Sequence, residues 1–134
     1  MAESIDLEIV TPERLVVKER VDDVQIPALR GYMGILPGHA ALLSELGTGY
    51  LSYSIGGKRR FLSVQGGFVE VLPDQVRILA NVAERAEEID IEKARQDLKK
   101  AEEQLVHAAV GVDPAVALED VALAQARVQA AEQK

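Results

Sequence analysis

The 134-residue sequence contains no cysteine and no tryptophan, and only 4% of its residues are aromatic. Without cysteine, disulfides, thiol chemistry and most structural zinc sites are excluded. With so few aromatic rings, stacking platforms for sugars or single-stranded nucleic acid are not expected. Apolar runs near the roughly 20 residues that cross a bilayer are missing as well. We therefore expect no direct insertion into a membrane.

The charge balance is acidic, with a formal net charge of -7. An acidic surface repels phosphate backbones, so nucleic acid is not an expected partner. The first ten residues, MAESIDLEIV, lack the basic region and apolar stretch of a signal peptide. Together with the absence of disulfides, this favours a cytoplasmic location. The composition, 48% hydrophobic and 28% charged, is typical of a globular protein.

Composition and periodicity both change near residues 84–88. All glycines except Gly111, all prolines except Pro114 and all aromatic residues precede this point. The preceding part has the patterns of strands and the following part has those of helices. We therefore predict two domains, residues 1–85 and residues 86–134.

The first part carries short stretches in which apolar and polar residues alternate. Residues 5–9, 51–55 and 76–80 follow this period of two, with glycine or proline turns at close spacing. Such a pattern is typical of antiparallel strands. Gly56-Gly57 suits a tight hairpin turn because both residues tolerate positive φ values. We predict an antiparallel β-sandwich or flattened barrel.

The second part follows a helical period. Gly111 is expected to end a first helix, Asp113 to cap a second and Pro114 to begin it. The two helices would form an antiparallel hairpin. Its seam is rich in alanine, which buries little apolar area, so the helices should dock weakly. The residues of the two expected apolar faces are Ile91, Ala94, Leu98, Ala101, Leu105 and Ala108 in the first helix, and Pro114, Ala117, Val121, Ala124, Val128 and Ala131 in the second.

The stretch RGYMGILPGHAALL is rich in loop-forming residues and contains His39, one of only two histidines. Catalysis by histidine needs an orienting carboxylate and a nucleophile or substrate within reach. No nucleophile motif accompanies His39 or His107. We expect His39 to tie down a turn or to contact a partner. A small hydrolase that uses His39 with Glu45 is the enzymatic alternative.

A second glycine-rich stretch, VQGGFVEV, contains Gly66-Gly67. It is not a phosphate-binding loop, because no lysine followed by serine or threonine comes after it. We expect a bulge or a tight connection between two strands. The sequence thus predicts no catalytic residue and no metal site.

Three stretches, GILPGHAALL, VQGGFVEV and NVAERAEEIDIEKA, occur in this order before the predicted hairpin. In order and spacing they resemble the epsilon subunits of bacterial F-type ATP synthases, and the resemblance covers essentially the whole chain. It implies a non-catalytic rotor subunit whose β-sandwich packs on the gamma subunit and the c-ring and helps couple ion-driven rotation to ATP synthesis. It also implies a peripheral protein on the cytoplasmic face of the cell membrane.

The resemblance implies that the hairpin either folds against the sandwich or extends along gamma into the catalytic alpha/beta head, where it blocks ATP hydrolysis. Four basic residues of the first helix are then candidate inhibitory contacts, although such a run is usually a solvated helix face. These residues are Lys93, Arg95, Lys99 and Lys100. A free-standing nucleotide-sensing or adaptor module of the same fold is the alternative.

The resemblance also assigns a c-ring contact. The loop from Arg30 to Gly34, with His39 just after it, matches the family segment that faces the c-ring. Its residues are Arg30, Gly31, Tyr32, Met33 and Gly34. Tyr32 stands where family members often carry an acidic residue, so the electrostatics of this contact differ here.

The family's nucleotide motif, Ile/Leu-Asp-x-x-Arg-Ala, corresponds to residues 89–94 of this chain. The resemblance therefore assigns a nucleotide site to Glu84, Asp90, Lys93 and Ala94. In some family members ATP binds this site and holds the hairpin folded. ATP is thus a candidate regulatory ligand, and no cofactor is required.

Two observations weigh against strong ATP binding. Asp90 is equally well placed as a helix N-cap, with Glu92 at the positive end of the helix. Lys93 stands where the family motif has arginine, so a point charge replaces a planar fork of donors. We expect Asp90 to cap the helix and ATP to bind weakly or not at all. Other basic residues could partly compensate if the folded hairpin brings them near, namely Arg95, Lys99 and Arg127.

Overall fold

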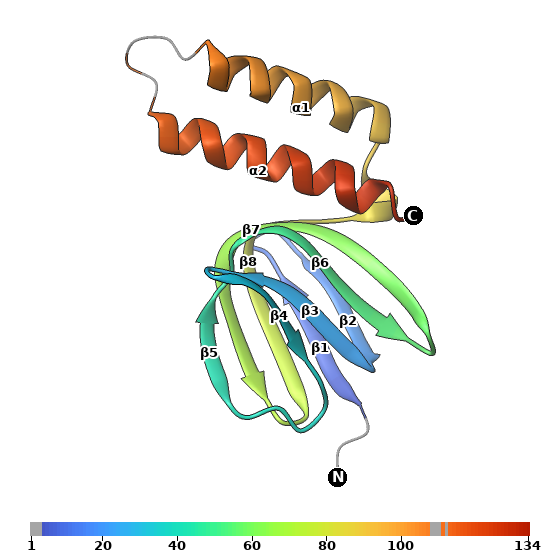
Figure 1. The fold of residues 1–134 in the computed structure, drawn as a ribbon. Coiled ribbons are helices and arrows are strands. Elements are labelled where there is room, and N and C mark those ends of the chain that lie inside the picture. Colours follow the sequence, from blue (N-terminus) through green and yellow to red (C-terminus); the bar gives the residue numbers. More distant parts are fainter. Residues whose placement is uncertain (1–3, 108–110, 112) are drawn as a thin grey trace.

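The computed structural model describes residues 4–107, 111 and 113–134. It consists of a β-sandwich followed by a helical hairpin that lies across one end of the sandwich (Figure 1). The strands are β1 (Ile5–Val10), β2 (Leu15–Val21), β3 (Asp23–Ala28), β4 (Gly31–Ile35), β5 (Leu42–Glu45), β6 (Thr48–Ile55), β7 (Lys58–Leu72) and β8 (Gln75–Arg85). A 3₁₀ turn, η1 (Ala86–Glu88), leads to the helices α1 (Ile91–Val106) and α2 (Pro114–Ala131).

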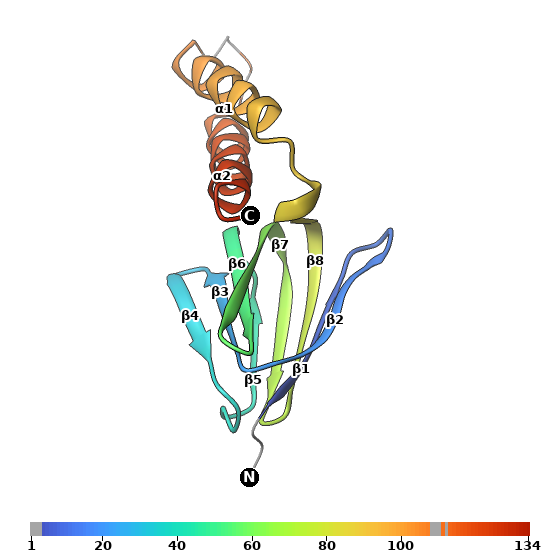
Figure 2. The same cartoon turned by 90° about the vertical axis from the view of Figure 1, so that its right-hand side faces the viewer.

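The strands follow the order β2-β1-β8-β7-β6-β3-β4, and β5 pairs with the far half of β7. All pairs are antiparallel except β1 and β8, which run parallel. The predicted sandwich is therefore confirmed, with one parallel pair added to the expected antiparallel pattern. No pairing between the end strands β2 and β4 occurs in the described part of the chain, so the sheet is not a closed barrel. Figure 2 shows the two layers edge-on, with β3, β4 and β6 opposite β1, β2 and β8.

The alternating residues form the core of the sandwich. Ile5, Leu7 and Ile9 of β1 are at most 1% exposed, and Val76 and Ile78 of β8 are fully buried. The predicted hairpin turn is also confirmed, since Gly56 and Gly57 have φ values of 57° and 83° between the paired ends of β6 and β7.

Gly66-Gly67 lies inside the long strand β7, so of the two expectations, a bulge or a tight connection between strands, the connection is wrong. The buried positions change phase across it, from Val64 before the glycines to Val69 after them. β7 also changes neighbours here, from β6 to β5. Gly67 has a φ of 117°, and a Cβ at this position would lie 1.9 Å from the carbonyl oxygen of Leu79. The close approach of two strands therefore requires glycine.

The predicted helix termini are confirmed at the start of α2 but not at the end of α1. The Asp113 carboxylate accepts a hydrogen bond from the Ala115 N–H at 2.9 Å, and Pro114 begins α2, as predicted. The first helix ends at Val106, before Gly111, so the prediction that Gly111 ends it is wrong. Gly111 has a φ of 96° and contributes to the connection between the helices. The expected apolar position Ala108 lies outside the described residues.

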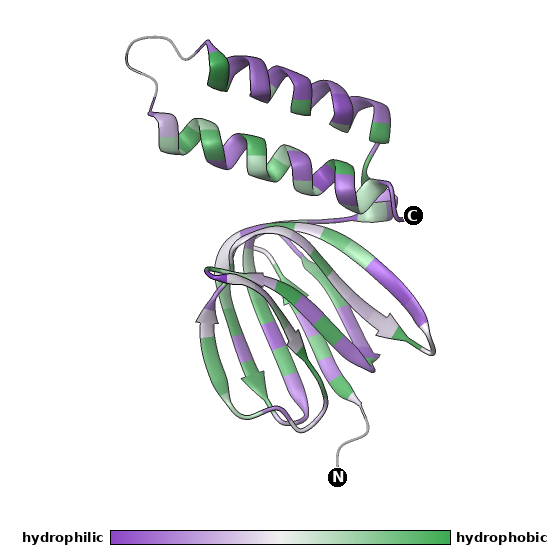
Figure 3. Ribbon diagram, viewed as in Figure 1, coloured by the Kyte–Doolittle hydropathy of each residue, from purple (hydrophilic) through white to green (hydrophobic). Residues whose placement is uncertain are grey.

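α2 lies between α1 and the sandwich, where it contacts β6 and β7 (Figures 1 and 2). Figure 3 shows that the composition of the helices matches this arrangement: the outer helix α1 is largely hydrophilic and the inner helix α2 is largely hydrophobic. The alanines predicted for the seam are buried, whereas Pro114, expected on the same face, is exposed. The buried helix residues are Ala94, Ala101, Ala117, Ala124 and Ala131 of the prediction, together with Ala126 and Ala130.

A second apolar cluster forms where the hairpin meets the sandwich. Its buried members are Ala86, Ile89, Ala94, Ala130 and Ala131, with Phe61, Ile91 and Val128 packed against them. Four of these eight side chains are alanine, and Phe61, Ile91 and Val128 are only partly buried. The apolar burial at this junction is therefore modest, and polar contacts add to it in holding the hairpin in place.

Candidate functional site

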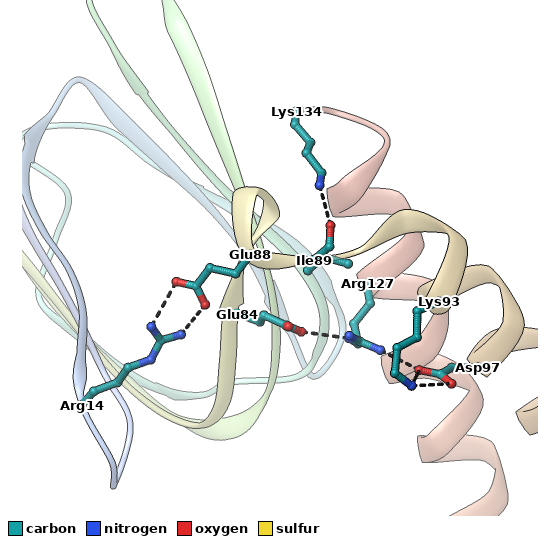
Figure 4. A network of polar contacts seen from close by, with 8 residues as sticks. All are labelled: Arg14, Glu84, Glu88, Ile89, Lys93, Asp97, Arg127 and Lys134. Carbon is teal, nitrogen blue, oxygen red and sulfur yellow. Dashed lines mark hydrogen bonds and ion pairs between the residues drawn. The ribbon is translucent and has the colours of Figure 1, made fainter.

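The junction of β8, α1 and α2 links two of the predicted nucleotide residues, Glu84 and Lys93, through Arg127 and Asp97 (Figure 4). At its centre Arg127 of α2 donates from Nε to Oε1 of Glu84 at 2.8 Å and from one terminal nitrogen to Oδ2 of Asp97 at 3.1 Å. The hydrogen bond that Arg127 donates to Glu84 is the main cause that raises the pKa of the Arg127 guanidinium, and burial opposes this shift. The Arg127 side chain is 22% exposed, so this pair is partly shielded from water.

The other residues of the predicted nucleotide site also have contacts within the chain. The Asp90 carboxylate accepts hydrogen bonds from the N–H groups of Glu92 and Lys93 at 3.1 and 3.2 Å, which confirms it as the N-cap of α1. The Lys93 ammonium lies 3.4 Å from Asp97, and the Lys93 side chain is 67% exposed. Ala94 is fully buried in the second apolar cluster.

The linker before α1 is anchored at a separate point. The Arg14 guanidinium, between β1 and β2, contacts both carboxylate oxygens of Glu88, at 3.0 and 2.6 Å. Arg85 adds a contact to Glu88 at 2.6 Å. At the end of the chain, Lys134 donates to the carbonyl oxygen of Ile89. These contacts fix the position from which the hairpin leaves the sandwich (Figure 4).

α2 touches the sandwich again near its N-terminal end. Thr48 of β6 donates its hydroxyl hydrogen to Oε2 of Glu119 at 2.8 Å, and Gln65 of β7 donates to the same oxygen at 3.2 Å. Eight residues separate Glu119 from Arg127, or roughly 12 Å along the helix. The hairpin is therefore held by polar contacts at two separated points of one helix.

The predicted c-ring residues do not form one loop. Gly31, Tyr32, Met33 and Gly34 lie in the strand β4, which corrects the expected loop, because these residues pair with β3. Arg30 lies in the turn before β4 and His39 in the connection after it, at opposite ends of the strand.

Tyr32 and His39 have defined contacts of their own. The Tyr32 hydroxyl oxygen accepts a hydrogen bond from the Tyr50 N–H at 3.1 Å, and the two rings are 5.0 Å apart. Burial raises the pKa of the Tyr32 hydroxyl. Nδ1 of His39 lies 2.7 Å from the carbonyl oxygen of Ala40, and the His39 N–H donates to Leu36, which confirms its role in a turn.

The candidate inhibitory residues lie along the outer helix. Lys93, Arg95, Lys99 and Lys100 are all exposed. Arg95 lies 3.0 Å from Glu92 of the same helix. Of the residues expected to compensate for Lys93, the fold brings Arg127 to the predicted nucleotide site and pairs Arg95 within its own helix.

One surface was not identified from the sequence. Phe68 of β7 pairs with Leu79 of β8, Leu79 with Val10 of β1, and Val10 with Leu15 of β2. These four residues, the apolar row, cross four adjacent strands, and Phe68, Leu79 and Leu15 are each 52% exposed. The phase change at Gly66-Gly67 turns Phe68 outward. The apolar residues of the row are visible in the sequence, but only the strand register shows that they are neighbours.

Two features are absent from the described residues, a cluster of metal ligands and a helix able to cross a membrane. Within residues 4–107, 111 and 113–134, no group of three or more potential metal ligands comes together. Neither helix of this described part is long and apolar enough to cross a membrane.

Comparisons with known proteins agree on one family. The family model for the "ATP synthase, Delta/Epsilon chain, beta-sandwich domain" matches residues 4–86. The ATP synthase epsilon chain of Solibacter usitatus (strain Ellin6076) is 52% identical over 134 residues, covering 100% of both chains. That of Nitratidesulfovibrio vulgaris (strain DP4) is 44% identical over 129 residues and 96% of both chains.

A solved structure shares the whole fold. A chain in the structure of the Euglena gracilis mitochondrial ATP synthase, comprising OSCP, F1 and the c-ring, aligns with a TM-score of 0.76 and 27% identity. The alignment covers 98% of this chain and 81% of that chain. Both the sandwich and the hairpin are therefore features of the fold that the two proteins share.

Proposed function

Because this chain belongs to the ATP synthase epsilon chain family, we propose that it is a non-catalytic rotor subunit of the central stalk of an F-type ATP synthase. In this role it couples ion-driven rotation of the c-ring to ATP synthesis. The identity of 52% over the full length of an epsilon chain is the observation that carries this function. The turn contacts of His39 support a structural role for that residue over a hydrolase.

The sandwich docks on the gamma subunit through the apolar row. Monomeric proteins seldom leave large apolar side chains in a contiguous exposed patch, and such patches mark contact sites. Phe68, Leu79 and Leu15 are each about half exposed on adjacent strands. A rotor subunit that transmits torque needs a contact of this kind, which apolar burial makes stable.

The c-ring is contacted by the residues that the sequence predicts for this role, Arg30 to Gly34 and His39. These lie along and beyond the edge strand β4, and Arg30 and Tyr32 are exposed. Through the c-ring the chain is held peripherally at the cytoplasmic face of the cell membrane.

The hairpin regulates ATP hydrolysis. In the folded form seen here it lies on the sandwich, and in an extended form it would reach the alpha/beta head, where Lys93, Arg95, Lys99 and Lys100 contact the head. The exposed side chains of this run support such a role. ATP is a candidate ligand at Glu84, Asp90, Lys93 and Ala94, where we expect it to bind weakly or not at all, and no cofactor is required.

The docking proposal is tested with a pull-down on the gamma subunit. Phe68→Glu places a charge in the apolar row, and we expect gamma binding to weaken on the order of tenfold or more. Ile55→Glu is the matched control, since Ile55 is also exposed and lies outside the row. Wild-type protein that shows no affinity for gamma would instead favour the free-standing adaptor module.

A further inference from the structure

We propose that Arg127 holds the hairpin folded against the sandwich without a nucleotide. We call the ion-paired group of Glu84, Asp97 and Arg127 the Arg127 latch. This inference deepens the proposed regulatory function, because it names the contact that sets the resting position of the hairpin. The closure itself is a property of the chain alone and does not depend on assembly into an ATP synthase.

A single guanidinium connects three elements of the fold. Glu84 lies near the end of β8, Asp97 in α1 and Arg127 in α2, so one guanidinium joins the sandwich to both helices (Figure 4). Moving the hairpin off the sandwich breaks the contact to Glu84, and separating the two helices breaks the contact to Asp97. A planar guanidinium suits this task because it can donate to two carboxylates at fixed angles.

The other contributions to docking of the hairpin are small. The buried residues of the two helices are all alanines, and four of the eight side chains in the cluster beside the latch are alanine as well. Docking also has a cost, because the fully buried Ser63 hydroxyl has no hydrogen-bond partner within the described part of the chain. Ser63 lies opposite Glu84 in the strand register, on the face that α2 covers. A partly shielded ion pair is therefore large enough to decide whether the hairpin is folded.

The residues of the predicted nucleotide site already have partners within the folded chain. The latch engages Glu84, the helix N-cap engages Asp90, and Ala94 is buried. The charges of the latch and Lys93 sum to zero, with two carboxylates facing two cations. Anionic phosphates would have to displace these carboxylates from Arg127 before gaining a contact. The folded state is thus complete without ATP.

The test is a distance measurement by electron–electron double resonance on the full chain. Because the sequence contains no cysteine, spin labels attach only at introduced positions. Lys58→Cys in the sandwich and Gln104→Cys in α1 are both exposed sites. For the wild-type background we expect one narrow distance distribution, unchanged by millimolar ATP with magnesium.

Removing the latch should open the hairpin. In Arg127→Gln we expect a second, longer and broader distance, with the open fraction raised roughly 5- to 30-fold. Glu84→Gln breaks the same pair from the sandwich side and should act in the same direction. Arg95→Gln is the matched control, because it removes an arginine paired within α1 and should leave the distance unchanged.

Two results would overturn the inference. One is a wild-type hairpin that is open without ATP and closes when ATP is added. The other is a single narrow distance retained in both Arg127→Gln and Glu84→Gln, with circular dichroism showing that both variants are folded. Neither result bears on gamma binding, so failure of the latch and failure of the proposed function are measured separately.

Discussion

Arg14 and Glu88 lie 74 positions apart in the chain and form a bidentate ion pair, with nitrogen–oxygen distances of 3.0 and 2.6 Å. The pair joins the turn between β1 and β2 to the 3₁₀ turn that leads into the hairpin. Hydrogen bonding from Arg14 is the main cause that lowers the pKa of the Glu88 carboxyl from its ordinary value of 4.5. Burial opposes this shift, and Arg85 adds to it.

The first prediction is that Glu88→Gln destabilises the protein at neutral pH but not in acid. A carboxyl whose pKa is lowered by folding stabilises the native state above its unfolded pKa, and this contribution is lost as the pH falls through the folded value. We expect a loss of about 1 kcal/mol at pH 7, as for a well-aligned pair near the surface. Urea unfolding at pH 7 and at about pH 3 measures this. Glu87→Gln, at a more exposed carboxylate 3.7 Å from Arg60, should change little at either pH.

The second prediction concerns the close approach of β7 and β8 at Gly67. Gly67→Ala should lower the free energy of unfolding by about 2 kcal/mol or more, because of the positive φ and the clash with the carbonyl oxygen of Leu79. Gly34→Ala is the control, since a Cβ at Gly34 meets no described atom within 4 Å. Equal stability of the two variants in urea would contradict this account of β7.

The third prediction separates the two roles of Asp90. Asp90→Ala should cost about 1 kcal/mol of stability through loss of the helix N-cap, whereas Asp90→Asn should retain most of it. Calorimetric titration with ATP, with and without magnesium, tests the ligand role. We expect weak or undetectable heat for the wild type and stronger binding in Lys93→Arg. Tight binding by the wild type that Asp90→Ala abolishes would make Asp90 a nucleotide ligand first and a cap second.

The fourth prediction compares the two ends of α2. Glu119→Ala removes the side-chain hydrogen bonds with Thr48 and Gln65. Because these bonds lie near the surface, we expect it to open the hairpin less than Arg127→Gln does. High salt should weaken the ion pairs of Arg127 more than the hydrogen bonds of Glu119, because the Debye length falls to about 3 Å at 1 M. The spin labels at positions 58 and 104 measure the open fraction in each variant and at each salt concentration. An opening in Glu119→Ala equal to that in Arg127→Gln would show that the two ends contribute alike.

Much of the secondary structure was predictable because it depends on near neighbours in the chain. Asp90 and Asp113 cap their helices through N–H groups two or three residues away. Gly56-Gly57 turns between strands that are adjacent in sequence. The resemblance of three short motifs likewise identified the family, which the full-length similarity confirms.

Errors arose where distant segments decide the local conformation. Gly66-Gly67 resembles a turn in isolation, but pairing with β8 continues on both sides of it and makes it part of one strand. The segment from Gly31 to Gly34 also appears loop-like from its glycines, and it is a strand because β3 supplies hydrogen-bond partners.

The sequence by itself determined the two-part architecture, the helix caps and the family, since period, capping and motif are properties of neighbouring residues. The tertiary structure alone decided which charges meet. Arg127 and Glu84 are 43 positions apart, and no local pattern distinguishes Arg127 from other basic residues of the chain. The same holds for the apolar row, whose members become neighbours only through the strand register. Both depend on the packing of distant elements, which a reading of local patterns does not contain.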